Sequence, residues 1–219
     1  MKYHKLVEQT LDEDLKSTFA KSLLGLSLLG TPKAVEVGYK QYIGTPKAVE
    51  VGYKQYSGPK NSMVINDASQ SVKQHEGLRT KVYKDSVGIP SIGYGYNLKR
   101  SFADSELNQV GSSLKAVMNG NPLTLKQINK LFEKDLQRSI LIAKKFIPNL
   151  DQQPDNIQIV LIDMAYNLGN RLFEFKKLQS AIQQKDYKRV GAEMKNSNWY
   201  RRVGLRGRNL VNLVLATIN

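Results

Sequence analysis

Residues 75–95 read His-Glu-Gly-Leu-Arg-Thr-Lys-Val-Tyr-Lys-Asp-Ser-Val-Gly-Ile-Pro-Ser-Ile-Gly-Tyr-Gly. The pattern predicts that a helix ends at Glu76 and that short strands follow, separated by glycine and proline. A second carboxylate, Asp85, comes nine residues later, and a hydroxyl, Ser91, six residues after that. Glycines such as Gly95 allow the backbone to approach a bulky substrate. The stretch therefore combines two carboxylates, a hydroxyl and an open backbone.

The surrounding pattern predicts a small antiparallel sheet. A short helix over 68–75, with Val72 facing inward, leads into strands at 80–84, 89–93 and 96–98. Downstream, a polar stretch at 102–117 favours helix, and Thr124 with Gln127 forms a capping box that opens a long helix. The apolar stripe of this helix, which ends before Pro148, is Leu125, Ile128, Leu131, Phe132, Leu136, Ile140 and Ala143.

The rest of the chain also favours helices. Asp155 with Gln158 predicts a second capping box, and Gly169 stands where that helix would end. Its apolar face is Ile157, Val160, Leu161, Met164 and Leu168. Further helices are predicted over 175–184, over 186–195 and from Trp199 onward. The fold class is α+β and mostly helical, with a sheet lobe and a helical lobe joined by one long helix, and Glu76 near the seam.

Three regions are expected. Residues 1–29 predict an amphipathic helix, which would dock on the main domain or a partner, or lie on a membrane surface. Residues 30–62 contain Gly-Thr-Pro-Lys-Ala-Val-Glu-Val-Gly-Tyr-Lys-Gln-Tyr twice, with a period of fourteen, and then a linker. Alternating valines and tyrosines favour two short strands there. The repeat is either a tolerated linker or a segment that binds the cell wall or a partner. Residues 63–219 form the main domain.

The amino-acid composition limits the kinds of metal site and binding partner that can be expected. The chain has 219 residues, no cysteine and two histidines, so neither a thiolate nor a His-rich metal site is expected, and we predict no cofactor. The net charge is +14, of which residues 68–219 carry +12. Such a surface attracts any polyanion, whether nucleic acid, anionic lipid or bacterial cell wall, or simply keeps the protein soluble. No apolar run reaches the ~18 residues of a membrane span, and no secretory signal is evident.

The two carboxylates suit cleavage of a glycosidic bond. That reaction needs a proton for the leaving oxygen and a negative group at the other face of the sugar. Burial against Leu78 and the second lobe would keep Glu76 protonated, while Asp85 and Ser91 could hold a water that attacks with inversion. By themselves the two acids could equally be solvated charges, or partners of Arg79 and Lys84.

The surrounding string resembles the active-site segment of the phage-type lysozymes. The similarity lies in Glu-Gly-Leu-Arg, Val-Tyr-Lys-Asp and Gly-Ile-Pro-Ser-Ile-Gly-Tyr-Gly, and it continues in the same order over about 68–216. Residues 123–136 resemble that family's inter-lobe helix, 162–169 its buried central helix, and 178–200 end in its Trp-Tyr pair. The resemblance implies a two-lobed lysozyme-like fold.

The resemblance also implies roles by position. Glu76 would be the general acid, Asp85 would stabilise the oxocarbenium charge and help hold the water, and Ser91 would position it. The family usually has Thr there, so we expect looser geometry. Arg206 matches the arginine that pairs with the acid, although it could instead bind wall anions.

The resemblance has implications for other positions too. Gly95 and Tyr166 would contact substrate, although Tyr166 suits the core equally well. Trp199 is expected to pack in the core, and His75 stands beside the acid or at a solvated helix end. Tyr96 replaces the family's usual histidine, so we expect a structural contact between that histidine and an acid to be missing.

The expected function is that of an N-acetylmuramidase, which cuts the β-1,4 bond between N-acetylmuramic acid and N-acetylglucosamine in peptidoglycan. We expect a monomer that binds no nucleic acid and waits in the host cytoplasm before lysis as an endolysin. One alternative is a virion-associated lysozyme docked through residues 1–67. Another is an inactive basic module that binds wall polymer or nucleic acid.

Overall fold

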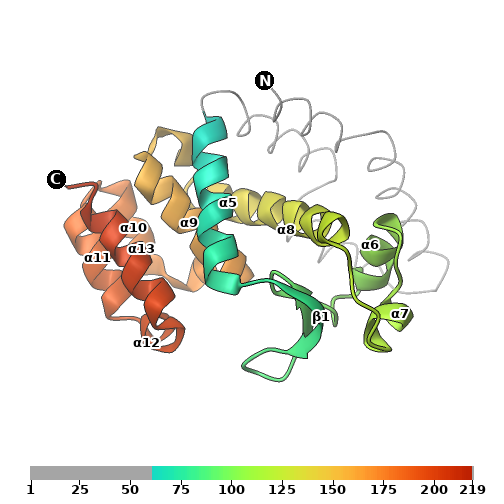
Figure 1. Ribbon diagram of the computed structural model, residues 1–219. Coiled ribbons are helices and arrows are strands. Elements are labelled where there is room, and N and C mark those ends of the chain that lie inside the picture. Colours follow the sequence, from blue (N-terminus) through green and yellow to red (C-terminus); the bar gives the residue numbers. More distant parts are fainter. Residues whose placement is uncertain (1–60, 219) are drawn as a thin grey trace, which may run out of the picture. The chain divides into compact units, whose positions relative to one another are not determined.

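The computed structural model describes residues 61–218. The helix predicted over 1–29 and the repeat lie outside the described residues, and the domain boundaries stay predictions. Figure 1 shows helix α8 running from the sheet, α6 and α7 at one end to the helices α9 to α13 at the other. The predicted class is confirmed, because most of the described chain is helical and it contains one small antiparallel sheet.

Helix α5, Ser62–Glu76, carries the candidate acid on its last residue. It begins six residues before the predicted start, because Val64, Ala68 and Val72 recur every four residues and are all buried. Gly77 follows with φ of 68° and donates its N–H to the carbonyl of Lys73. A glycine adopts this left-handed conformation without steric cost, so the helix stops here.

The predicted sheet is confirmed as three antiparallel strands in sequence order. They are β1, Arg79–Lys84, β2, Pro90–Gly93, and β3, Tyr96–Asn97. Ser91 pairs with Tyr83 on one side and Asn97 on the other. Register shifts between Arg79 and Tyr83, so an irregularity bends β1 where it leaves Glu76. One face of the sheet is covered by a small core that includes residues of α6, α7 and α8.

Helices α6, Ala103–Gln109, and α7, Leu114–Met118, occupy the stretch predicted as helix-prone. The capping box before α8, Leu125–Phe146, is confirmed: Thr124 accepts from the N–H of Gln127, whose side chain accepts from Thr124 N–H. The predicted stripe is buried except for Leu125, which is 58% exposed. Leu125 is the first helical residue and precedes Ile128, where α8 enters the core beside the sheet.

The second lobe follows as a run of helices. They are η2, Leu150–Gln152, α9, Asp155–Leu168, η3, Gly169–Glu174, α10, Lys176–Gln183, α11, Tyr187–Lys195, α12, Asn198–Val203, and α13, Leu205–Leu215. Helix α9 packs against α5, α8 and α13, and its predicted apolar face is buried. It is the central helix of this lobe, and it therefore reaches both α5 and α13.

The capping box predicted at Asp155 is wrong. Pro154 is the N-cap of α9 and Asp155 is already helical, so Asp155 cannot cap the helix with its side chain. Gln158 instead donates to the backbone carbonyl of Gln153 at 2.7 Å. Gly169 ends the helix with φ of 56°, as predicted. None of the helices among residues 61–218 is both long and apolar enough to cross a membrane.

Candidate active site

Glu76 lies at the end of α5 beside a guanidinium. Its Oε1 accepts a hydrogen bond from Nη1 of Arg206 at 2.6 Å, and its side chain is 18% exposed. The predicted contact between these residues is thus present, although they are 130 positions apart. Glu76 is largely buried, as predicted, beside a residue of the second lobe, whereas Leu78, which was also expected to cover it, is itself 44% exposed. It follows Gly77, where the chain turns away from the helix and into β1.

Gly95 provides the space that the other carboxylate oxygen occupies. It has φ of 80°, and an ideal Cβ at this position would lie 2.9 Å from Oε2 of Glu76. Both the conformation and the close approach require glycine. The loop between β2 and β3 therefore borders the acid directly, while a contact of Gly95 with substrate stays a prediction.

Arg206 is held by more than the acid. It is 7% exposed on α13, and its Nε donates to Oδ1 of Asp163 at 2.7 Å. Its Nη2 donates to the backbone carbonyl of Asp163 at 3.3 Å. Burial opposes the charge of Arg206, but Asp163 and Glu76 outweigh it and raise the pKa of the guanidinium. The guanidinium thus bridges two carboxylates.

Asp163 was missed in the sequence, although a lone carboxylate between Ile162 and Met164, in an otherwise apolar run, was a visible signal. It is fully buried on α9, and its Oδ2 accepts from Ser71 Oγ at 2.6 Å and lies 3.0 Å from His75 Nδ1. Burial raises the pKa of Asp163, but the hydrogen bonds from His75 and Ser71 and the charge of Arg206 outweigh it and bring the pKa below its ordinary value.

His75 is a buried member of this cluster and not a solvated residue at the helix end. Its side chain is 7% exposed, and its Nε2 lies 3.3 Å from Nδ2 of Asn209 on α13. Asn209 was also missed, because only the tertiary fold brings α13 to α5. The C-terminal turn of α5 is thus bound to both α9 and α13.

Asp85 and Ser91 meet at the tip of the first hairpin. The Asp85 N–H donates to the carbonyl of Ile89 at 2.9 Å, and the Ser91 hydroxyl donates to the same oxygen at 3.4 Å. Asp85 Oδ1 in turn accepts the N–H groups of Val87 and Ile89. These contacts fix one oxygen of Asp85 and leave Ser91, which is 2% exposed, with a long and weak hydrogen bond.

Tyr83, on β1 opposite Ser91, connects the two halves of the site. Burial raises the pKa of Tyr83, the negative charge of Glu76 adds to this, and the charge of Asp85 contributes in the same direction. The nearby charge of Arg79, whose guanidinium lies 5.0 Å from the Tyr83 ring centroid, acts against them. The phenol therefore lies in the field of both candidate catalytic carboxylates. Nothing in the sequence pattern singled it out.

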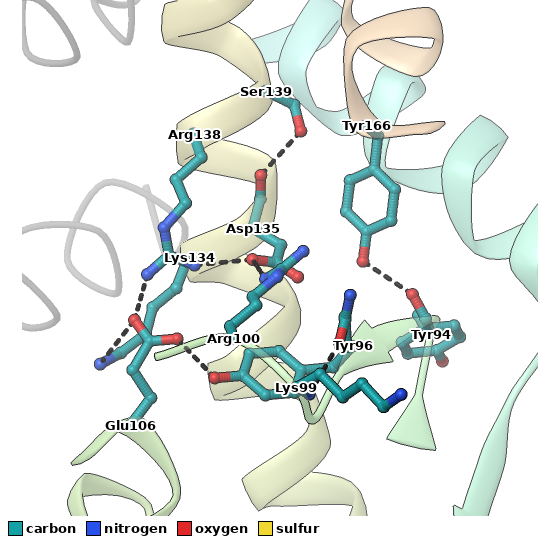
Figure 2. A network of polar contacts seen from close by, with 11 residues as sticks. Tyr94, Tyr96, Lys99, Arg100, Glu106, Lys134, Asp135, Arg138, Ser139 and Tyr166 are labelled. Atoms are coloured by element: carbon teal, nitrogen blue, oxygen red, sulfur yellow. Dashed lines mark hydrogen bonds and ion pairs between the residues drawn. The ribbon is translucent and has the colours of Figure 1, made fainter. Parts of the chain in front are cut away.

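Tyr166 is half-buried on α9 and spans toward the sheet. Its hydroxyl donates to the carbonyl of Tyr94 at 2.8 Å (Figure 2). The centroid of its ring lies 5.7 Å from that of Phe132. It thus links the helical lobe to the loop that borders Glu76. Trp199 is buried as expected and donates its indole N–H to Asn167 at 2.9 Å.

Position 96 has no histidine, yet it still contacts an acid. Tyr96 is buried, and its hydroxyl donates to Oε2 of Glu106 at 2.8 Å (Figure 2). Arg138 on α8 pairs with Glu106 and also with Asp135, at 2.6 Å. Arg100 pairs with Asp135 at 2.5 Å. A tyrosine side chain is longer than a histidine side chain, and Tyr96 reaches Glu106 on α6. Through Glu106 and Arg138, these contacts connect the sheet to α8.

Comparison with known proteins gives consistent matches. The Phage lysozyme family model matches residues 73–214. The pre-baseplate central spike protein Gp5 of Enterobacteria phage T4 is 29% identical over 156 residues, which are 67% of this chain and 27% of Gp5. This chain therefore corresponds to only part of that protein.

Two proteins of Dictyostelium discoideum match over nearly their whole length. Probable T4-type lysozyme 1 is 28% identical over 165 residues, covering 69% of this chain and 95% of that protein. Probable T4-type lysozyme 2 is 23% identical over 164 residues, covering 68% and 94% respectively.

Proposed function

Since the chain belongs to the phage lysozyme family, we propose that this glycosidase hydrolyses the β-1,4 bond between N-acetylmuramic acid and N-acetylglucosamine in peptidoglycan, with inversion. The observation that carries the proposal is the Glu76 carboxylate, which is held by Arg206 at 2.6 Å and bordered by Gly95. A fixed, partly buried carboxylate beside an open backbone loop suits a proton donor to a bulky sugar.

The surroundings of the three site residues support the role that we propose for each. Glu76 donates its proton to the leaving glycosidic oxygen. Asp85 stabilises the positive charge on the sugar ring and accepts a hydrogen bond from the attacking water. Two backbone N–H groups on its Oδ1 fix the orientation that this role requires. Ser91, whose hydroxyl is only weakly engaged, directs the water to the face opposite the leaving group.

The charge of the main domain suits this substrate. Peptidoglycan is acidic, and residues 68–219 carry a net charge of +12, so the wall polymer is attracted over a long range at low salt. In this proposal the enzyme is a monomeric endolysin that acts on the host wall and releases phage progeny. It reaches the wall from the host cytoplasm once another protein has breached the membrane.

A second location is favoured by one observation, the similarity to the pre-baseplate central spike protein of phage T4. In that case the same chemistry would serve cell entry, and residues 1–67 would dock the lysozyme to the particle. Immunoblots of purified virions distinguish the two. A band that copurifies with infectious particles supports a role in cell entry. Abundant protein in lysates, with none in the particles, supports the endolysin.

The activity is tested by digesting purified peptidoglycan with the wild type, Glu76→Gln and Glu193→Gln, and measuring the release of reducing ends. Glu193 pairs with Arg189 on the surface of α11 and controls for loss of a carboxylate as such. Wild type and Glu193→Gln should release reducing ends equally, and Glu76→Gln should release almost none. Equal release by Glu76→Gln would refute the assignment of the acid. NMR of the first-formed anomer tests inversion.

A further inference from the structure

A buried cluster of Asp163, Arg206 and His75 lies behind Glu76. Resting on the proposed role of Glu76 as the acid, we infer that Asp163 is a positioning residue that keeps Arg206 charge-compensated, so that Glu76 can carry a proton beside a buried guanidinium. Asp163 does not contact substrate in this inference. It acts through Arg206.

The geometry shows how tightly Asp163 is built into the lobe. Its carboxylate is fully buried and meets three side-chain partners, Arg206 at 2.7 Å, Ser71 at 2.6 Å and His75 at 3.0 Å. Its backbone carbonyl accepts a further bond from Arg206. Two of these partners lie on α5 and one on α13, so Asp163 fixes the end of the helix that carries the acid relative to the arginine.

His75 completes the cluster through two polar contacts. Its Nε2 lies 3.3 Å from the amide nitrogen of Asn209, and its Nδ1 lies 3.0 Å from Oδ2 of Asp163. The ring thus joins Asp163 on α9 to Asn209 on α13. The guanidinium paired with the negative charge of Asp163 is that of Arg206.

This charge balance decides how readily Glu76 holds a proton. If Arg206 had only Glu76 as its partner, protonation of Glu76 would leave a buried, uncompensated cation, which is costly. With Asp163 present, Arg206 keeps a carboxylate partner when Glu76 is protonated, and ionisation of Glu76 places a second negative charge beside this pair. The Asp163 charge therefore favours the proton on Glu76. Arg206 alone would work against it.

Charges on every neighbouring element act on this balance. Around Glu76 lie Arg206 on α13, Asp163 on α9, His75 on α5, and the phenols of Tyr83 on β1 and Tyr166 on α9, both of which are in the field of Glu76. Arg79 and Asp85 act on Tyr83 in turn, with opposite sign. Both phenols are neutral near physiological pH, because burial and the nearby negative charges raise their pKa values. The two carboxylates paired with Arg206 are therefore Glu76 and Asp163.

The test compares two variants that alter opposite sides of the hydrogen bond between His75 and Asp163. Asp163→Asn is close in shape and removes a charge, whereas His75→Gln keeps a donor and leaves the charge of Asp163 in place. The rate of reducing-end release is measured from purified peptidoglycan at low substrate concentration and constant salt across pH, so that the alkaline limb reports the acid of the free enzyme. Thermal melting of each variant is measured at the same pH values.

The expected result is a shift of the alkaline limb for only one variant. Asp163→Asn should move it to lower pH by on the order of one unit, the effect of one charge removed across a short, partly screened distance. His75→Gln should keep the limb at the wild-type position, whatever its effect on the maximal rate or the melting temperature. A merely structural role for Asp163 would lower stability without moving the limb.

The outcomes separate this inference from the proposed function. If wild type is active, Glu76→Gln is inactive, and the limbs of Asp163→Asn and wild type coincide, the inference is wrong and the function stands. If Glu76→Gln is as active as wild type, the assignment of the acid fails first.

A measurement on the wild type covers the case in which Asp163→Asn does not fold. NMR titration of the carboxyl carbons should show Asp163 ionised throughout the range in which Glu76 loses its proton. An Asp163 that titrates within that range would overturn the inference, because its charge would then be absent when it is needed.

Discussion

Replacing Gly95 by alanine tests how closely the loop between β2 and β3 confines the acid. The added Cβ would lie 2.9 Å from Oε2 of Glu76, whereas ordinary contact begins near 3.4 Å, so the carboxylate must retreat by about 0.5 Å. It cannot do so freely, since Oε1 is bonded to Arg206 at 2.6 Å. A misplacement of this size should lower the rate of reducing-end release by roughly 10-fold.

The substitution also strains the backbone, because position 95 has φ of 80°. A left-handed alanine costs about 1–2 kcal/mol, which lowers the melting temperature by roughly 2–8 °C in a protein of this size. Gly120→Ala is the matched control. Gly120 has φ of 92°, and a Cβ there would meet nothing within 4 Å.

Both variants are assayed for melting temperature and for release of reducing ends from purified peptidoglycan. Both should melt earlier, and only Gly95→Ala should lose activity. If Gly95→Ala is as active as Gly120→Ala at a temperature where both are folded, the loop does not confine Glu76 and the reasoning is refuted.

Three further results are expected. Tyr96→Phe leaves the buried Glu106 without the hydroxyl that donates to it at 2.8 Å. Urea denaturation should show a free energy of unfolding lower by about 1–3 kcal/mol, with an unchanged rate of reducing-end release, and undiminished stability would show that this hydrogen bond does not stabilise the fold. Ser91→Ala should slow reducing-end release by about 10–100-fold with little change in melting temperature, while Ser91→Thr retains the rate; a fully active alanine variant would exclude the hydroxyl from positioning water. Asp163 has a lowered pKa in the folded protein, so its stabilising effect is present above its ordinary value and is lost as the pH falls through the lowered one. The melting temperatures of wild type and Asp163→Asn should therefore converge toward acid pH, and a constant difference would contradict this.

Local signals in the sequence were sufficient for much of the fold. The Thr124–Gln127 capping box depends on residues three apart, so it could be predicted without knowing the tertiary structure. The three strands follow from glycine and proline spacing in the same way. The second capping box failed because Pro154 precedes Asp155 and sets the start of the helix one residue earlier than the capping pattern requires.

The candidate site was less accessible to sequence reasoning. Glu76 and Arg206 were identified through family resemblance, but the environment of the acid was not: Leu78 is exposed, and a charged cluster fills the space behind the carboxylate. Asp163 and Asn209 become neighbours of His75 only when three helices distant in sequence pack together. Such contacts have no local pattern, so they could not be predicted from spacing.

The separation of 130 positions between Glu76 and Arg206 has a consequence for biosynthesis. The sheet lobe and α8 lie earlier in the chain, whereas the guanidinium that holds the acid emerges from the ribosome only with α13. A nascent or truncated polypeptide that lacks this helix therefore has Glu76 without its partner. The Glu76 carboxylate therefore gains its buried partner only after α13 has been synthesised and has docked.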